Sequence, residues 1–340
     1  MDTTPAWKRI AWALALVALV VAGDRALAAG LHSAVMHTGN RFAVLYRGDA
    51  PGGVLVLGNS RGVNTFHAPT LERALGRPVF NASANGAPTA LSEVLLRDYV
   101  ERNPAPELVV LEVTGVAGGV DQFATFFPFG AESARLDAYL DGAVPASVAA
   151  ARRVSALFDY NGELLFRALG SAGASDQGQI NRYTVSPELV EATRRGGPTE
   201  LRARPENLDA LGRIVAFCRA EGVELRLVIG PYLPAFREKI GTYDAWLARV
   251  RQAANGTPIW DYSNALDDPS LFADRLHMNH RGAQALTPIL IADGLFDPAT
   301  PPVPRPLRTP PAASPLPVGQ SEGSGHTPSA DGPPTRALSL

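Results

Sequence analysis

The sequence predicts an α/β fold in which helices cover both faces of a parallel sheet. Short apolar runs of strand length alternate with longer stretches whose apolar residues recur at helical spacing. Chains that alternate in this way bury a parallel sheet between two helical layers. The chain has 340 residues, of which 46% are hydrophobic and 19% charged, so it has a globular composition and ample length for a core.

Five strands and five helices are expected, in alternation. The strands cover residues 54–57, 78–80, 107–113, 223–229 and 258–260, and the helices cover residues 69–76, 90–103, 205–222, 242–256 and 279–295. Pro104 and Pro106 stop the second helix, because proline cannot continue one. Gly222 and Gly256 lie where the third and fourth helices end, as expected near a C-cap.

The N-terminal segment predicts a membrane helix. Lys8 and Arg9 precede an apolar run over residues 10–23, and the helical pattern continues beyond it without a breaker. Since about 20 apolar residues span a bilayer, residues 1–30 are expected to be an uncleaved signal anchor. The alternatives are a signal cleaved after "ALA" at residues 26–28, or a buried core helix. Because basic residues stay inside, an anchor would leave the following domain on the periplasmic side of the cytoplasmic membrane.

Two further segments depart from the alternating pattern. Residues 121–198 read as a mostly helical insertion in a domain that spans residues 31–296, and "FATFFPFG" at 123–130 is expected to cap a cleft or lie near the bilayer. Residues 297–340 hold proline, serine and glycine with few large apolar residues, so they are expected to be a disordered tail. His326 lies in that tail and is discounted.

Charge and cysteine usage exclude some function classes. The net charge of −2 gives no sign of nucleic-acid binding, so no nucleic acid is expected as a partner. Cys218, the only cysteine, lies at helical spacing with apolar neighbours and is expected to be a buried core thiol. The histidines and acidic residues form no evident ligand cluster, so neither a metal nor a cofactor is expected.

The first candidate for chemistry is Ser60, in "GVLVLGNSRG". It follows directly on the first strand, and ligands of parallel sheets sit outside the carboxyl ends of the strands. Gly58 and Gly62 allow a sharp bend that would present the serine as a nucleophile. The alternative is an ordinary turn in which Ser60 caps the next helix.

The second candidate is the loop in "VFNASANGAPTA". A short strand again runs into small polar residues, and the N–H of Gly86 would face the same cleft as Ser60. The alternative is a further loop of the scaffold.

The third candidate is the pair Asp274 and His277, in "FADRLHMNHRGAQAL". Residues three apart in a turn point the same way, which suits a carboxylate that orients an imidazole. Such an imidazole activates a serine hydroxyl. Alternatively His277 is a surface or capping residue, and His280 is the competing base; His32, His37 and His67 have no evident carboxylate partner.

The three motifs together resemble those of SGNH/GDSL hydrolases, over about residues 45–115 and 222–295. "GNSRG" is similar to the first block, "NASANG" to the second and "DRLH" to the last. Among these, the chain is most similar to membrane-anchored SGNH-like proteins of the bacterial envelope, which are related to proteins of alginate O-acetylation and teichoic acid D-alanylation. The resemblance implies a flavodoxin-like three-layer sandwich. It also implies Ser60 as nucleophile, His277 as base, Asp274 as its orienting carboxylate, and the Ser60 and Gly86 amides as oxyanion hole.

The chain departs from the family pattern in two blocks. Asn59 stands where the first block usually has aspartate, and this position mainly shapes the turn. In "LEVTGVAGG" Val116 stands about where the third block supplies an asparagine side chain to the oxyanion hole. Loss of one such donor costs a factor on the order of 10²–10³ in rate. Asn85, Thr114 and Arg61 are the substitutes that the sequence offers.

The resemblance therefore implies a serine esterase or O-acyltransferase that acts on acyl groups ester-linked to an envelope carbohydrate or lipid. Its expected partners are that substrate, the membrane and an envelope polysaccharide machinery. The alternative is a catalytically impaired protein that binds glycan or serves as a scaffold in an envelope assembly.

Overall fold

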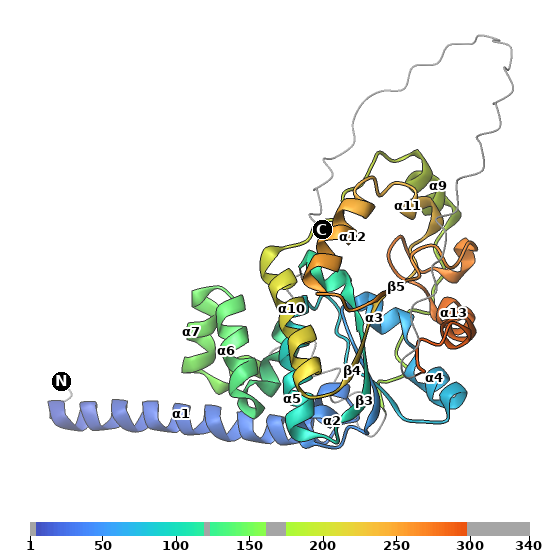
Figure 1. The fold of residues 1–340 in the computed structure, drawn as a ribbon. Coiled ribbons are helices and arrows are strands. Elements are labelled where there is room, and N and C mark those ends of the chain that lie inside the picture. Colours follow the sequence, from blue (N-terminus) through green and yellow to red (C-terminus); the bar gives the residue numbers. More distant parts are fainter. Residues whose placement is uncertain (1–4, 119–122, 161–174, 298–340) are drawn as a thin grey trace, which may run out of the picture.

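The sheet has five parallel strands in the order β2-β1-β3-β4-β5. The computed structural model describes residues 5–118, 123–160 and 175–297 (Figure 1). The strands are β1 (Gly53–Leu57), β2 (Val79–Asn81), β3 (Pro106–Glu112), β4 (Glu224–Ile229) and β5 (Ile259–Asp261). This order is that of flavodoxin-like sheets, which bind ligands where the connections from neighbouring strands diverge to opposite faces. The predicted fold class is confirmed.

The central strands are apolar because helices cover both of their faces. Every residue of β1 is buried, and in β3 only Glu107 is exposed. A strand buried on both faces reads as a continuous apolar run rather than an alternating one. That is why these strands were predictable within about one residue of their ends.

Two helical layers cover the sheet (Figure 1). One layer holds α2 (Arg41–Arg47), α5 (Thr89–Arg102), α10 (Pro205–Ala220) and α12 (Tyr243–Ala253); the other holds α3 (Ser60–Thr65), α4 (Ala68–Leu75) and α13 (His280–Ala292). All five expected helices are present among these. Cys218 lies on the buried side of α10 with 1% of its surface exposed, as expected for a core thiol.

Between β3 and α10, the part of the chain that the structure describes forms a largely helical insertion. It comprises η1 (Val113–Ala117), η2 (Phe123–Glu132), α6 (Ala134–Ala143), α7 (Ala146–Val154), η3 (Ala156–Tyr160) and α9 (Pro187–Arg195). After β4 follow the short helices α11 (Pro234–Arg237) and η4 (Pro269–Leu271).

The aromatic run of η2 packs into the core against α2, so its buried rings neither cap a cleft nor face lipid. Phe126 and Phe129 are buried and pack on aromatic rings of α2. The ring centroids of Phe126 and Phe42 are 4.6 Å apart, and those of Phe129 and Tyr46 are 5.7 Å apart. The rings of Phe42 and Tyr46 belong to α2, a helix that the sequence analysis did not predict. Aromatic pairs at such distances stabilise a core.

The N-terminal helix α1 (Ala6–Met36) extends away from the rest of the fold (Figure 1). Its most apolar 18-residue window has none of its residues buried, so the alternative of a buried core helix is wrong. By length and composition the helix is able to cross a membrane. The proposed tail lies outside the described residues, apart from Asp297.

Candidate active site

Ser60 is held at the carboxyl end of β1 by a turn that only glycine permits. Gly58 has a φ of +148°, and a Cβ there would lie 2.9 Å from Glu112 Cβ. Asn59 then caps α3 by accepting a hydrogen bond from the N–H of Arg61 at 2.8 Å. Ser60 is thus the first residue of α3, half-buried at the edge where the strands end.

Ser60, His277 and Asp274 form one chain of hydrogen bonds. Ser60 Oγ lies 2.6 Å from His277 Nε2, although the two residues are 217 positions apart in the chain. On the other side of the ring, His277 Nδ1 lies 2.9 and 3.0 Å from the two carboxylate oxygens of Asp274. In such an arrangement the carboxylate fixes Nδ1 as the protonated nitrogen and leaves Nε2 to accept a proton from the hydroxyl.

A tight loop holds Asp274 and His277 together. Asp274 Oδ1 accepts hydrogen bonds from the N–H groups of Leu276 and His277, at 2.7 and 2.9 Å. An antiparallel bridge between Phe272 and Met278 closes the loop at its base, where its two ends meet. Asp274 and His277 are therefore close, as predicted, because hydrogen bonds to the backbone of this loop hold them together.

These hydrogen bonds also affect the ionisation of Asp274. Partial burial raises the pKa of this carboxyl, but the hydrogen bond and charge of His277 and the backbone N–H groups of Leu276 and His277 outweigh it. The net result is a pKa below the usual value, so the carboxylate is charged at neutral pH.

Gly86 lies beside the end of β1, in a turn directly after β2. The N–H of Ala84 donates to the carbonyl of Gly58 at 3.0 Å, and the turn closes with a bond from Ala87 N–H to Ala84 O at 3.1 Å. Within the turn Gly86 has a φ of +69°, a conformation that glycine adopts without strain. Asn85, the other central residue of the turn, is exposed.

Neither Thr114 nor Arg61 is free to replace the missing third-block donor. Thr114 Oγ1 donates to Glu112 Oε2 at 2.5 Å and accepts from Asn59 Nδ2 at 3.1 Å. Arg61 is 5% exposed and points into the protein. Val116 is fully buried, so it contributes no polar group either. Of the three substitutes, only Asn85 has a side chain at the surface.

Arg61 joins the ends of three strands to the loop that carries Asp274 and His277. Its guanidinium pairs with Glu112, which ends β3 and is 1% exposed, at an Nε–Oε1 distance of 3.2 Å. It also donates to Leu276 O, next to His277, and to Gly230 O and Pro231 O, which follow β4. The sequence analysis did not single out Glu112, although a carboxylate at the end of an apolar strand was the available signal.

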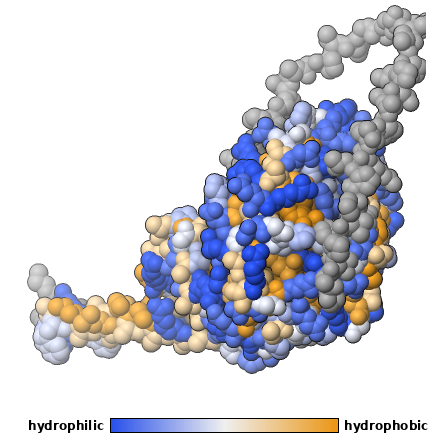
Figure 2. Space-filling view, viewed as in Figure 1, coloured by the Kyte–Doolittle hydropathy of each residue, from blue (hydrophilic) through white to orange (hydrophobic). Residues whose placement is uncertain are grey.

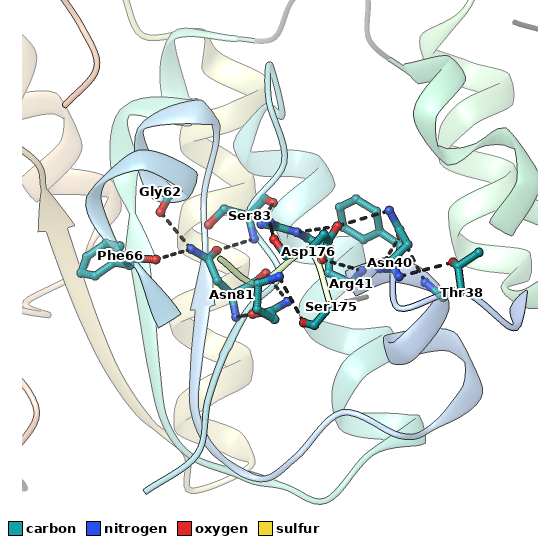
Figure 3. Close-up of polar contacts among 12 residues, drawn as sticks. Thr38, Asn40, Arg41, Gly62, Phe66, Asn81, Ser83, Ser175 and Asp176 are labelled. Atoms are coloured by element: carbon teal, nitrogen blue, oxygen red, sulfur yellow. Dashed lines mark hydrogen bonds and ion pairs between the residues drawn. The ribbon is translucent and has the colours of Figure 1, made fainter. Parts of the chain in front are cut away.

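Asn81 fixes the far end of α3 (Figure 3). It is 2% exposed, and its Nδ2 donates to Gly62 O at 3.1 Å and to Phe66 O at 2.8 Å. Its Oδ1 accepts from the N–H of Ser83 at 3.0 Å. Gly62 serves this close approach rather than the bend at the strand end, because a Cβ there would lie 2.5 Å from Ser83 Oγ.

Asn64 is a second residue that sequence reasoning missed. One turn after Ser60, its Nδ2 donates to Ser60 O at 2.7 Å, and its Oδ1 accepts from the N–H of Asn181 at 2.9 Å. Asn181 in turn accepts from the N–H of His280 at 2.8 Å. A segment of the insertion therefore borders the site and ties α3 to α13.

Among the described histidines, His277 is the one bonded to Ser60. The others have these partners: His280 N–H with Asn181 O, His67 Nδ1 with Thr70 Oγ1, and His37 Nδ1 with Ser33 O. No group of three or more metal-ligating side chains occurs within residues 5–118, 123–160 and 175–297.

The expectation that His32 has no carboxylate partner is wrong. Its Nε2 lies 2.8 Å from Glu132 Oε1, and its Nδ1 lies 3.0 Å from the hydroxyl of Tyr160. Both partners are at least 100 positions away in the chain, so no local pattern could reveal them. This cluster lies at the base of α1 and does not involve Ser60.

No protein-family model matches the sequence, and no curated protein matches it. Solved structures similar to the chain include a candidate platelet activating factor from Streptococcus pneumonia, at 15% identity and a TM-score of 0.37, with 83% of this chain and 98% of that one covered. A GDSL-like lipase from Bacteroides thetaiotaomicron matches at 12% identity and a TM-score of 0.34, with 71% and 86% covered. A candidate SGNH hydrolase from Slackia heliotrinireducens matches at 12% identity and a TM-score of 0.34, with 72% and 99% covered.

The last two of these structures are GDSL or SGNH proteins by description, the superfamily that the three sequence motifs resemble. At these identities and TM-scores the matches carry no argument about function. The function of this chain is therefore inferred from its own residues.

Removing Arg61 should destabilise the protein more than removing an exposed arginine. Arg61→Ala leaves Glu112 buried without its cation, which typically costs about 3–5 kcal/mol. Arg213→Ala removes an ion pair with Glu93 whose arginine is 53% exposed, worth about 1 kcal/mol or less. Urea unfolding of both variants measures the difference, and equal losses would contradict the role of the buried pair.

The stability contributed by Asp274 should depend on pH. Because its folded pKa lies below the unfolded value of about 3.9, its contribution is complete above that value and is lost as pH falls through the folded pKa. Unfolding free energies of wild type and Asp274→Asn should therefore differ most at neutral pH and converge below about pH 4. A difference that stays constant from pH 7 to pH 3 would contradict this linkage.

Proposed function

We propose that the chain is a serine-dependent esterase or O-acyltransferase of the SGNH type. Its substrates would be acyl groups ester-linked to a carbohydrate or lipid of the cell envelope. The observation that carries the proposal is the hydrogen-bonded series Ser60–His277–Asp274 at the carboxyl edge of a parallel sheet. A serine, an imidazole and a carboxylate in this order are what nucleophilic acyl chemistry needs.

In the first half-reaction Ser60 Oγ attacks the ester carbonyl carbon while its proton passes to His277 Nε2. The tetrahedral intermediate then collapses, the bond to the alcohol oxygen breaks, and His277 returns the proton to that leaving alcohol. Asp274 stabilises the imidazolium between the two steps. The product is an acyl-enzyme on Ser60.

The negative charge on the carbonyl oxygen requires donors near Ser60. The N–H of Ser60 is at the first position of α3, where a helix leaves an N–H without an internal partner. The Gly86 N–H lies in the neighbouring turn. These two amides are the proposed oxyanion hole, with the Asn85 side chain as a candidate third donor.

The second half-reaction decides between hydrolase and transferase. Water attacking the acyl-enzyme gives an esterase, whereas a sugar hydroxyl gives an acyltransferase. In both cases His277 accepts the proton of the attacking hydroxyl, the bond between the acyl carbon and Ser60 Oγ breaks, and His277 returns the proton to Ser60 Oγ. The triad serves both outcomes. An acyltransferase would act together with an envelope polysaccharide machinery.

The alternative function is a catalytically impaired protein that binds glycan or scaffolds an envelope assembly. Val116 favours it, because a buried valine stands where the third block supplies an oxyanion donor. Loss of one donor slows such reactions by a factor on the order of 10²–10³, which is severe but leaves chemistry detectable.

The proposed location is the cytoplasmic membrane, with the α/β domain on the periplasmic side. Lys8 and Arg9 at the start of α1 support this orientation. An uncleaved anchor is further supported by contacts upstream of residue 29. Asp24 and Arg25 hydrogen-bond to residues of α7 and η3, and a cleaved chain would lose both contacts.

Ser60→Ala should abolish turnover of an activated acyl ester while the fold is retained, because the nucleophile is removed and no core contact is lost. A fluorophosphonate probe should label wild type at Ser60, since it reacts with any activated serine. His277→Ala should lose this labelling, and Asp274→Asn should lower it by a factor on the order of 10³–10⁴. Mass spectrometry locates the adduct.

His280→Ala is the matched control, since it removes an imidazole three residues from His277 and keeps the backbone N–H that bonds to Asn181, while Ser60 Oγ is bonded to His277. It should keep the labelling. A folded wild type that is not labelled would reject the enzyme and favour the scaffold function.

The protein should be found in the membrane fraction with its N-terminus uncleaved, and it should resist extraction with carbonate. Mass spectrometry of the N-terminal peptide from that fraction tests the anchor. A mature start near Ala29 would reject the anchor but keep the export, and full-length protein in the cytosol would reject both.

A further inference from the structure

The exposed part of α1 ends where the insertion begins to touch the helix. Residues 6–22 are all exposed, and nine large apolar side chains among them are 49–75% exposed (Figure 2). Burial starts at Gly23 and Asp24, and Ala28, Val35 and Met36 are buried against the domain. The helix is thus bare over its first half and docked over its second.

The docking begins at the corner between α7 and η3, residues 153–157. The carboxylate of Asp24 accepts hydrogen bonds from Ser155 Oγ at 2.5 Å and from the N–H of Ala156 at 2.8 Å. Arg25 Nη2 donates to Val154 O at 3.3 Å. Further along α1, His32 bonds to the insertion as well. Because α1 contacts the insertion both at Asp24 and Arg25 and at His32, the position of the corner along the helix axis is fixed.

That position coincides with the outer boundary of a bilayer. The hydrocarbon core is about 30 Å thick and takes about 20 helical residues. The 18 helical residues 6–23, which lead up to Asp24, are about 27 Å long at 1.5 Å per residue, and the long side chains of Lys8 and Arg9 reach the inner interface from within this span. The level of Asp24 and Arg25, and with it the corner, therefore falls at the outer end of the membrane-spanning length.

The corner presents an apolar side chain at this level. Val154 is 78% exposed, more than any other large apolar side chain within residues 5–118, 123–160 and 175–297. Outside α1, the only other exposed one in that part of the chain is Tyr183, at 60%. Beside Val154, Arg153 is 68% exposed, and a long cationic side chain suits a lipid interface.

We propose that residues 153–157 rest on the outer leaflet and seat the α/β domain on the bilayer, with Val154 in the interface. The inference relies on the proposed membrane anchoring of α1. The partner is the phospholipid surface itself. The insertion then fixes the distance of the α/β domain from the membrane surface and its orientation, which a flexible linker would leave variable.

The test uses the full-length protein in liposomes, with a fluorophore on Val154→Cys. Tyr183→Cys is the matched control, because it replaces the other exposed apolar side chain outside α1. Cys218 is 1% exposed and stays unlabelled in the folded protein. Lipids with a nitroxide at the headgroup or at the start of the acyl chain quench only fluorophores at the interface. Circular dichroism checks that both variants are folded.

The expected result is loss of most of the fluorescence at position 154 and little loss at position 183. Membrane-bound protein with equal, weak quenching at both positions would overturn the seating but not the anchor. Protein that does not float with the liposomes would overturn both. Fluorophosphonate labelling of Ser60 in the same samples reports separately on the proposed chemistry, because lipid depth does not affect the identity of the nucleophile.

Discussion

The buried ion pair of Arg61 and Glu112 is the constraint on which the site depends. Two charges removed from water are tolerated only if each finds enough partners, because desolvation of an unpaired ion costs several kcal/mol, on the order of the whole folding free energy. Arg61 meets this condition with carbonyls after β4 and in the loop of Asp274 and His277, and its guanidinium lies 3.7 Å from the centre of the Tyr232 ring. The ends of β1, β3 and β4 must therefore converge, and this convergence brings His277 to Ser60.

Asparagine side chains also hold α3, the helix that carries Ser60, in place. The helix that carries Ser60 has six residues, too few to be stable alone. Asn59 caps its start, Asn64 donates to the carbonyl of Ser60, and Asn81 donates to the carbonyls of Gly62 and of Phe66, the residue that follows the helix. An amide side chain donates and accepts at once, so Asn64 and Asn81 each tie two backbone segments together. Ser60 is thus positioned by its surroundings rather than by the propensity of its own helix.

The described part of the insertion packs both on α1 and on the α/β domain. Its centre is Arg152, which is 8% exposed and bonds to Asp137, Asp141 and Asp159. These bonds hold α6, α7 and η3 together, and η2 packs against α2 of the α/β domain. Packed elements therefore link α1 to the sheet without a break.

The sequence by itself determined the alternation of strands and helices, the parallel sheet and the order of Ser60, Asp274 and His277. These features depend on local periodicity and on contacts three residues apart, which a linear pattern records. Tertiary structure alone decided the rest. The pairs Arg61–Glu112, His32–Glu132 and Phe42–Phe126 join residues 51, 100 and 84 positions apart. Their formation depends on the tertiary fold, because the local sequence around either partner contains no information about the other.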